Sequence, residues 1–176
     1  MAVATVQGVR TTRVRHRDRT YTPSIEMAGL FMLLLGAWGG IVPFVGPLFG
    51  FNGDGSASWT WNLSHALLSA TPGAVAVAAG ILVMLAGPTL YRPGGLKVGG
   101  LLAVLCGAWF VVGPVAWPVL EHAKVFVGAS PIRELAYWIG YSLGPGTLLI
   151  ALGAFVIGRP MPEPTVLPAR PTTAPA

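Results

Sequence analysis

The sequence predicts an all-α membrane protein with four transmembrane helices, and two observations support this prediction. The first is composition: of 176 residues, 53% are hydrophobic and only 10% are charged, whereas an average soluble domain carries roughly 25% charged residues. The second is that the apolar residues are concentrated in long blocks, each supplying the ~20 residues that a bilayer-spanning helix needs. The blocks are Ile25–Leu48, Leu63–Leu85, Leu96–Val119 and Leu135–Ile157.

Each block is expected to be a helix that stays in the membrane. None carries a Lys, Arg or Asp in its middle, where such a charge would cost ~2.5–3.5 kcal/mol on insertion scales. In hydrocarbon the backbone must satisfy its own hydrogen bonds, which a single segment can do only as a helix. The first block is too long for the apolar region of a cleaved signal peptide, and the polar leader before it is also long.

The sequence contains an internal repeat. GAWGGIVP at residues 36–43 recurs as GAWFVVGP at residues 107–114, an offset of 71. Further along, Thr71-Pro72-Gly73 aligns with Gly144-Pro145-Gly146 at an offset of 73, and the difference falls in a loop, where length changes are tolerated. We therefore expect a tandem duplication of a two-helix hairpin. The motif residues are Gly36, Trp38, Pro43, Trp61 and Pro72 in the first repeat, and Gly107, Trp109, Pro114 and Pro145 in the second.

The repeat divides the chain into four parts and sets its expected orientation. The hairpins span residues 25–90 and 91–158, between a basic leader (1–24) and a Pro/Ala/Thr-rich tail (159–176), both expected to be disordered. Two helices per repeat relate the hairpins by a pseudo-two-fold axis along the membrane normal. Of the 11 Lys and Arg residues, only Lys124 and Arg133 lie in the first or third interhelical loop. The positive-inside rule then predicts a plasma-membrane protein with both termini in the cytoplasm.

The arginine-rich leader, VRTTRVRHRDRTYTPS, has two interpretations. Its arginines set the topology in the first. In the second they also bind anionic lipid, since a basic residue beside the membrane gains ~1 kcal/mol at an anionic leaflet. The leader lacks the folded scaffold that groove recognition requires, so no nucleic-acid partner is expected.

Small residues at four-residue spacing predict helix-packing faces. Lipid gives helices no hydrophobic reason to associate, so close backbone contact through small side chains carries more of the association. On this basis we expect packing faces on the first three helices. Their residues are Gly36 and Gly40 on the first, Ala76 and Gly80 on the second, and Gly95, Gly99, Ala103 and Gly107 on the third.

Tryptophan and proline gather toward the extracytoplasmic side. The six Trp residues favour an interfacial belt with packing contacts, because the indole is apolar while its N–H requires a partner. Each proline removes a backbone donor and predicts a kink. The kinks would either open a cavity to the outside or only bend the helices to pack short loops. The prolines concerned are Pro43, Pro47, Pro72, Pro114, Pro118 and Pro145.

Few residues suggest chemistry. Ser64 and His65 begin the second helix, and Glu121 and His122 end the third on the same side. They form a candidate zinc or proton site, with interfacial polar caps as the simpler interpretation. Ser24 before Glu26 suggests a cap on the first helix. The single cysteine, Cys106, is expected to be a small buried apolar residue. No catalytic constellation and no cofactor are predicted.

The repeat resembles the SPW repeat family of bacterial membrane proteins. The resemblance rests on Trp38–Pro43 followed by Trp61-Asn62, and on Trp109–Pro114 in the second repeat, and covers about Gly29 to Ile157. The second hairpin departs from the pattern, with Glu134-Leu135 where Trp-Asn is expected. The resemblance implies an integral membrane protein with no established biochemical activity.

Three functional hypotheses follow. The leading one is a non-enzymatic protein acting through helix association, as a homo-oligomer or as an accessory subunit of a larger membrane complex. The second is a small transporter or channel subunit, with an outward cavity lined by polar side chains. Its candidate lining is Ser64, His65, Ser69, Thr71, Ser142 and Thr147. The third is a membrane enzyme that uses His65, Glu121 and His122.

Overall fold

The computed structural model describes residues 22–51, 55–86, 93–121 and 131–159, and within them all regular structure is helical. The predicted leader and tail fall almost wholly outside the described residues. The elements in chain order are α1 (Thr22–Val45), the 3₁₀ turn η1 (Gly46–Phe49), α2 (Leu63–His65), the π-helical turn η2 (Ala66–Ala70), α3 (Thr71–Ala86), α4 (Pro93–Glu121), α5 (Pro131–Tyr137), the π-helical turn η3 (Trp138–Leu143) and α6 (Gly144–Ile157).

Four helical stretches are long and apolar enough to cross a membrane. Three of them join consecutive elements, α1–η1 and α2–η2–α3 in the first hairpin and α5–η3–α6 in the second. The stretches are Pro23–Phe49, Leu63–Ala86, Gly94–Val119 and Glu134–Ile157. Their bounds lie within two residues of the blocks read from the sequence, so the prediction of an all-helical chain with four potential spans is confirmed.

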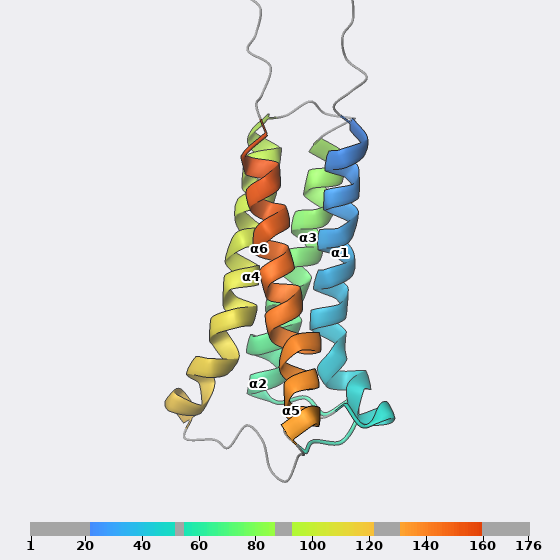
Figure 1. The fold of residues 1–176 in the computed structure, drawn as a ribbon, viewed down its shortest axis with the longest axis vertical. Coiled ribbons are helices and arrows are strands. Elements are labelled where there is room, and N and C mark those ends of the chain that lie inside the picture. Colours follow the sequence, from blue (N-terminus) through green and yellow to red (C-terminus); the bar gives the residue numbers. More distant parts are fainter. Residues whose placement is uncertain (1–21, 52–54, 87–92, 122–130, 160–176) are drawn as a thin grey trace, which may run out of the picture.

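The helices form an elongated bundle with two distinct ends (Figure 1). We call one end the terminal end; α1 and α4 begin there, and α3 and α6 end there. We call the opposite end, which contains η1, α2 and α5, the distal end. Helix α1 packs most extensively on α3, and α4 on α6. The α3–α4 contact joins the two pairs on one side, and a smaller contact between α1 and α6 joins them on the other.

Glycines set the closest approach between α1 and α3. A methyl group added at Gly36 would lie 2.9 Å from the carbonyl oxygen of Gly73, and one added at Gly80 would lie 2.6 Å from that of Gly29. Real side chains do not come this close to backbone atoms, so the helices cross at a separation that only glycine permits. Gly40 lies in the same contact, with its added methyl 3.5 Å from the Cα of Gly73.

The α4–α6 contact is built in the same way. A methyl group at Gly146 would lie 2.8 Å from the carbonyl oxygen of Gly107, and one at Gly100 would lie 3.0 Å from that of Gly153. The small residues of α4 contact two neighbouring helices. Gly100 and Gly107 face α6, whereas Gly99 faces Val83 of α3. Of the other predicted packing positions, Ala103 and Ala76 are fully buried and Gly95 is half-buried.

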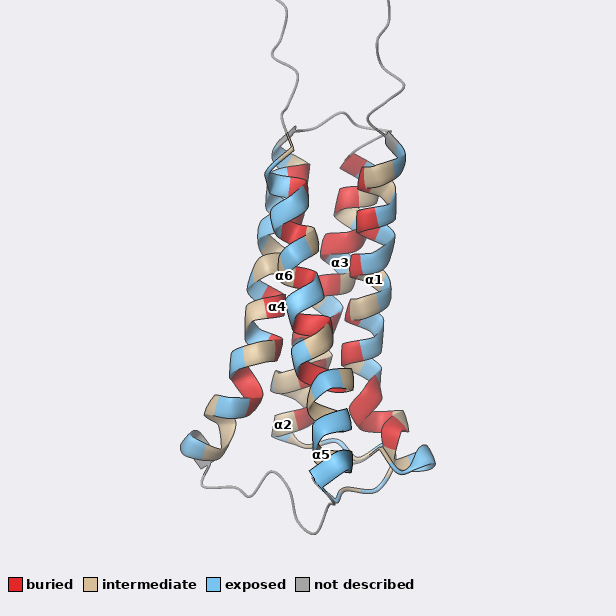
Figure 2. Cartoon of the chain, in the orientation of Figure 1, coloured by how far each residue is buried: buried red, intermediate tan, exposed pale blue. Residues whose placement is uncertain are grey.

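Large apolar side chains lie mainly on the outside of the bundle. Figure 2 shows the buried residues on the faces that the helices turn toward one another. The core is rich in alanine, and the outer faces carry leucine, isoleucine, valine and phenylalanine. This arrangement suits a surface in contact with lipid, where exposure of apolar groups is not penalised.

The prolines shape the distal half in two ways. Pro43, Pro114 and Pro118 lie inside helices, and Figure 1 shows α4 and the end of the first span bending away from the bundle there. Pro72 and Pro145 instead lie at the second position after the π-helical turns η2 and η3, behind the cap residues Thr71 and Gly144. The wider π turn accommodates a proline ring that would press on a carbonyl of the preceding α-helical turn.

The glycine contacts predict a sharp positional difference in stability. We expect Gly80→Ala to lower the free energy of unfolding by about 1–3 kcal/mol, because the new methyl meets backbone atoms that cannot move aside. Gly94 is the matched control, since it is helical and exposed, with open space around it. Gly94→Ala should be neutral or stabilising, by up to about 1 kcal/mol from helix propensity.

Unfolding both variants in mixed micelles, followed by circular dichroism, measures the difference. Equal effects at the two positions would contradict the close crossing.

Candidate functional site

Two tryptophans link the hairpins through crossed hydrogen bonds. The indole Nε1 of Trp38, on α1, donates to the carbonyl oxygen of Gly140 in η3 at 2.8 Å. The Nε1 of Trp109, on α4, donates to that of Leu67 in η2 at 2.9 Å. Each hairpin therefore supplies one donor and one acceptor, and the offsets between corresponding residues are those of the sequence repeat, 71 for the tryptophans and 73 for the acceptors.

The acceptors are carbonyls that their own helices leave without a donor. In a regular α-helix the N–H of Thr71 would donate to Leu67, but in η2 it donates to Ala66. A continued π turn would use the next N–H, and residue 72 is a proline, which has none. The carbonyl of Leu67 thus depends on a donor from another helix, and Trp109 provides it.

The second hairpin repeats this arrangement. The N–H of Gly144 donates to Ile139 instead of Gly140, and Pro145 supplies no N–H. The carbonyl of Gly140 is therefore free to accept from Trp38. Because an unpaired carbonyl in hydrocarbon costs several kcal/mol, each tryptophan compensates for a proline on a different helix.

A buried serine replaces the backbone hydrogen bond that a third proline removes. Pro114 deprives the carbonyl of Phe110 of its helical donor, and the hydroxyl of Ser142 donates to that oxygen. Ser69, offset from Ser142 by the same 73 residues, forms a hydrogen bond with the hydroxyl of Tyr141. Both serines are fully buried. The side chain of Phe110 fills the centre of the bundle beside Gly39 of α1.

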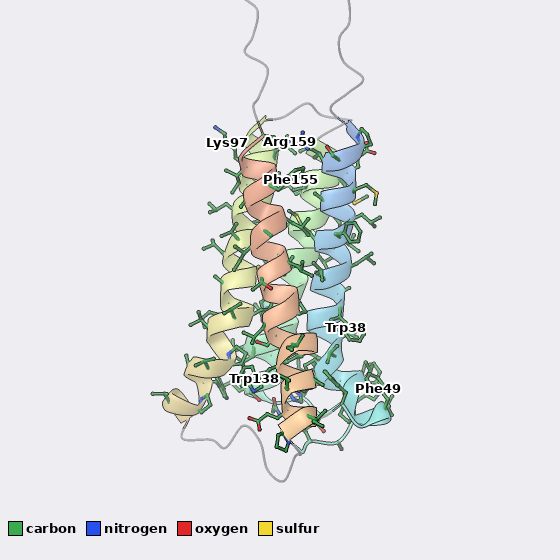
Figure 3. The ribbon with its side chains drawn as sticks, viewed as in Figure 1. Trp38, Phe49, Lys97, Trp138, Phe155 and Arg159 are labelled. Carbon is green, nitrogen blue, oxygen red and sulfur yellow. The ribbon has the colours of Figure 1, made fainter. Side chains whose placement is uncertain are left out.

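Aromatic rings extend this network into the distal end. Phe44 contacts the rings of Trp59, Trp61 and His65, with centroids 4.9–6.3 Å apart. A second chain of rings runs from Phe49 through Phe51 and Tyr137 to Tyr141. Figure 3 places Trp38, Trp138 and Phe49 in this half of the molecule. The aromatic side chains thus tie the distal loops and short helices to the bundle.

The candidate zinc or proton site is only partly described. Asn62 caps α2, and its side-chain oxygen accepts from the backbone N–H of His65 and from the hydroxyl of Ser64, both at 2.7 Å. The buried His65 ring also lies 2.8 Å from the carbonyl of Thr60 through Nδ1. His122 and the side chain of Glu121 lie outside the described residues.

Within residues 22–51, 55–86, 93–121 and 131–159, no three His, Cys, Asp or Glu side chains group as metal ligands do. Asn62 is the residue that the sequence reasoning missed in this role. Its signal was an asparagine directly before a helical apolar run.

The polar residues proposed to line a cavity do not share one space. Ser69 and Ser142 are buried in the hydrogen bonds described above. Thr71 and Thr147 face the outside of the bundle, and the Thr147 hydroxyl donates to the carbonyls of Leu143 and Gly144 in its own helix. Ser64 is occupied at the α2 cap.

The crossed bonds predict matched losses at the two tryptophans. Trp38→Phe and Trp109→Phe should each lower the free energy of unfolding by about 0.6–1.7 kcal/mol, which are the average and the maximum found for hydrogen bonds between membrane helices. Trp61→Phe is the control, because Trp61 is 70% exposed and its ring contact with Phe44 survives the change.

The control should change stability by less than about 0.5 kcal/mol. Unfolding titrations of the three variants in the same detergent measure the losses. A large loss in the control, or none at Trp38 and Trp109, would show that the indole N–H groups do not carry this role.

Comparison with known proteins adds no relative: no protein-family model matches the chain, and no curated protein or solved structure is significantly similar to it. The resemblance to the SPW repeat family therefore stays a prediction carried by the Trp and Pro positions, and the functional argument depends on the contacts of this chain alone.

Proposed function

We propose that this chain is a non-enzymatic, multi-pass protein of a bacterial plasma membrane, with both termini in the cytoplasm. It acts by association, either with further copies of itself or as an accessory subunit of a larger membrane complex. We also propose that the chain arose by tandem duplication of one hairpin resembling the SPW repeat.

The paired contacts support the duplication. The crossed tryptophan bonds, the two π turns and the glycine crossings all recur at offsets of 71 in the first helix and 73 in the second helix of each hairpin. Compensating contacts of this kind are expected when two copies of one hairpin pack about a pseudo-two-fold axis.

The charge distribution supports the orientation. Lys97 and Arg159 both lie at the terminal end of the bundle, as Figure 3 shows. The helix ends that adjoin the leader, residues 87–92 and the tail are at the same end. This is the side on which the positive-inside rule places basic residues.

The observation that carries the association proposal is an aromatic surface at the distal end. Leu48, Phe49, Trp59 and Trp61 are each 61–70% exposed there, on η1 and the loop that follows. Trp and Phe are enriched at protein interfaces and dominate their binding energy. The small-residue faces, by contrast, are occupied inside the chain by the α1–α3 and α4–α6 crossings. A partner is therefore expected at the distal aromatic surface.

Mild-detergent purification from native membranes, sized by native mass spectrometry, tests the association. We expect a stable homo-oligomer or heteromeric complex that dissociates when Phe49 and Trp61 are both changed to Ala. Each lost contact is expected to weaken binding by ~10-fold or more, as interface aromatics do. Leu105→Ala is the control, because Leu105 is 57% exposed on the mid-bundle surface of α4.

A lone monomer at every protein concentration would contradict the proposal. Dissociation by the Leu105 control but not by the aromatic variant would move the interface from the distal end to the helix surface.

A further inference from the structure

An apolar groove separates α1 from α6 at the terminal end. It has a volume of about 400 Å³ and lies between two helices whose mutual contact is smaller than the α1–α3, α4–α6 and α3–α4 contacts. This volume falls within the ~300–1,000 Å³ typical of small-molecule sites. Apart from Ser24 its lining side chains are all apolar, namely Met27, Ala28, Phe31, Leu148, Ala151, Leu152 and Phe155.

Ser24 and Phe155 of this lining both contact Arg159. The guanidinium of Arg159 donates through Nη2 to the Ser24 hydroxyl at 3.2 Å, linking the end of the last span to the first turn of α1. Its Cζ also lies 4.4 Å from the centre of the Phe155 ring. Figure 3 shows Arg159 and Phe155 together at this end of the bundle.

Ser24 does not cap α1 as the sequence suggested. The helix begins at Thr22, so Ser24 lies inside the first turn, and its hydroxyl accepts from Arg159. Among the described residues, Arg159 forms no ion pair with a carboxylate. A guanidinium has five N–H donors, and most of these remain available to an anion.

The length of the groove and the position of Arg159 suit the acyl chain and the phosphate of a single phospholipid. From Ser24 to Phe31 the groove extends along α1 by roughly 10 Å at 1.5 Å per residue, about a third of the hydrocarbon core. It is open to the side of the bundle, where acyl chains lie. A lipid phosphate at the membrane surface would sit beside Arg159, while the chain below it occupies the groove.

We propose that this groove binds an anionic glycerophospholipid of the leaflet next to the two termini. Arg159, with Ser24, binds the phosphate, and one acyl chain lies between α1 and α6. The phosphate supplies the counter-charge that the groove residues lack, which an apolar helix of a second copy would not bring. This inference is independent of the proposed association, whose surface is at the opposite end.

Native mass spectrometry of the purified full chain with added dioleoyl-phosphatidylglycerol tests the headgroup contact. Arg159→Gln should weaken binding of the first lipid by about tenfold or more, the effect of losing a charge-assisted hydrogen bond. Lys97→Gln removes an equal charge from an exposed position on α4 at the same end. We expect that control to stay within about twofold of the unmodified chain, since a solvated charge contributes little.

A second pair of variants tests the acyl chain. Ala151→Trp should fill the groove and weaken binding of phosphatidylglycerol and phosphatidylcholine alike by about tenfold. Ala154→Trp is the control, because Ala154 is exposed on the same helix but does not line the groove. Inorganic phosphate should not compete, since it lacks the chain.

Three results would overturn the proposal. The first is unchanged lipid binding in both Arg159→Gln and Ala151→Trp. The second is a loss in Arg159→Gln alone together with competition by inorganic phosphate, which would indicate an anion site without a chain slot. The third is conversion of a dimer to a monomer by Ala151→Trp without a change in lipid binding, which would assign the groove to a second copy.

Discussion

The hydrogen bonding of backbone carbonyls that prolines leave without donors is the constraint on which the rest of this structure depends. In water such a carbonyl would be solvated at little cost, but inside a bilayer it needs a donor from the protein. Here the donors come from side chains on other helices, the indoles of Trp38 and Trp109 and the hydroxyl of Ser142. A local defect in one helix is thereby converted into a specific contact with another.

Glycine packing makes this exchange geometrically feasible. The α1–α3 and α4–α6 crossings bring backbones close enough that an added methyl would approach a carbonyl to within 3.0 Å. Phe110, Ser69 and Tyr141 are among the buried residues that fill the space between the hairpins. Close packing within each hairpin and polar contacts between them give a bundle whose surface carries large apolar side chains. Among the described helices, α1 and α6 pack on each other less than the other neighbouring pairs do, and the groove proposed to bind a lipid lies between them.

The helical spans could be predicted from the sequence because they depend on a local property. A block of about 20 apolar residues has essentially one structure in a membrane, and the observed ends differ by at most two residues from those expected. The partner of each glycine could not be predicted in the same way. Four residues advance a helix face by ~40°, so Gly99 and Gly107 of one four-residue series turn toward different neighbours.

The crossed hydrogen bonds could not be predicted from the sequence for a different reason. They depend on two π turns, and no residue pattern specifies a π turn reliably. The recurrence of Trp before Pro was visible, but it pointed to a lipid interface belt as readily as to a donor for a particular carbonyl. The α2 cap by Asn62 was local and could have been recognised.

The most direct test of this account is a double-mutant cycle between Pro72 and Trp109 in the intact chain. Replacing Pro72 with Ala restores an N–H beside η2, so the carbonyl of Leu67 regains a helical donor. We predict that Trp109→Phe costs about 1 kcal/mol in the original chain and close to zero in the Pro72→Ala background.

The matched cycle pairs Trp109→Phe with Pro145→Ala and should be additive, because Trp109 does not bond to η3. An equal cost of Trp109→Phe in all three backgrounds would contradict the claim that the tryptophan compensates for the proline.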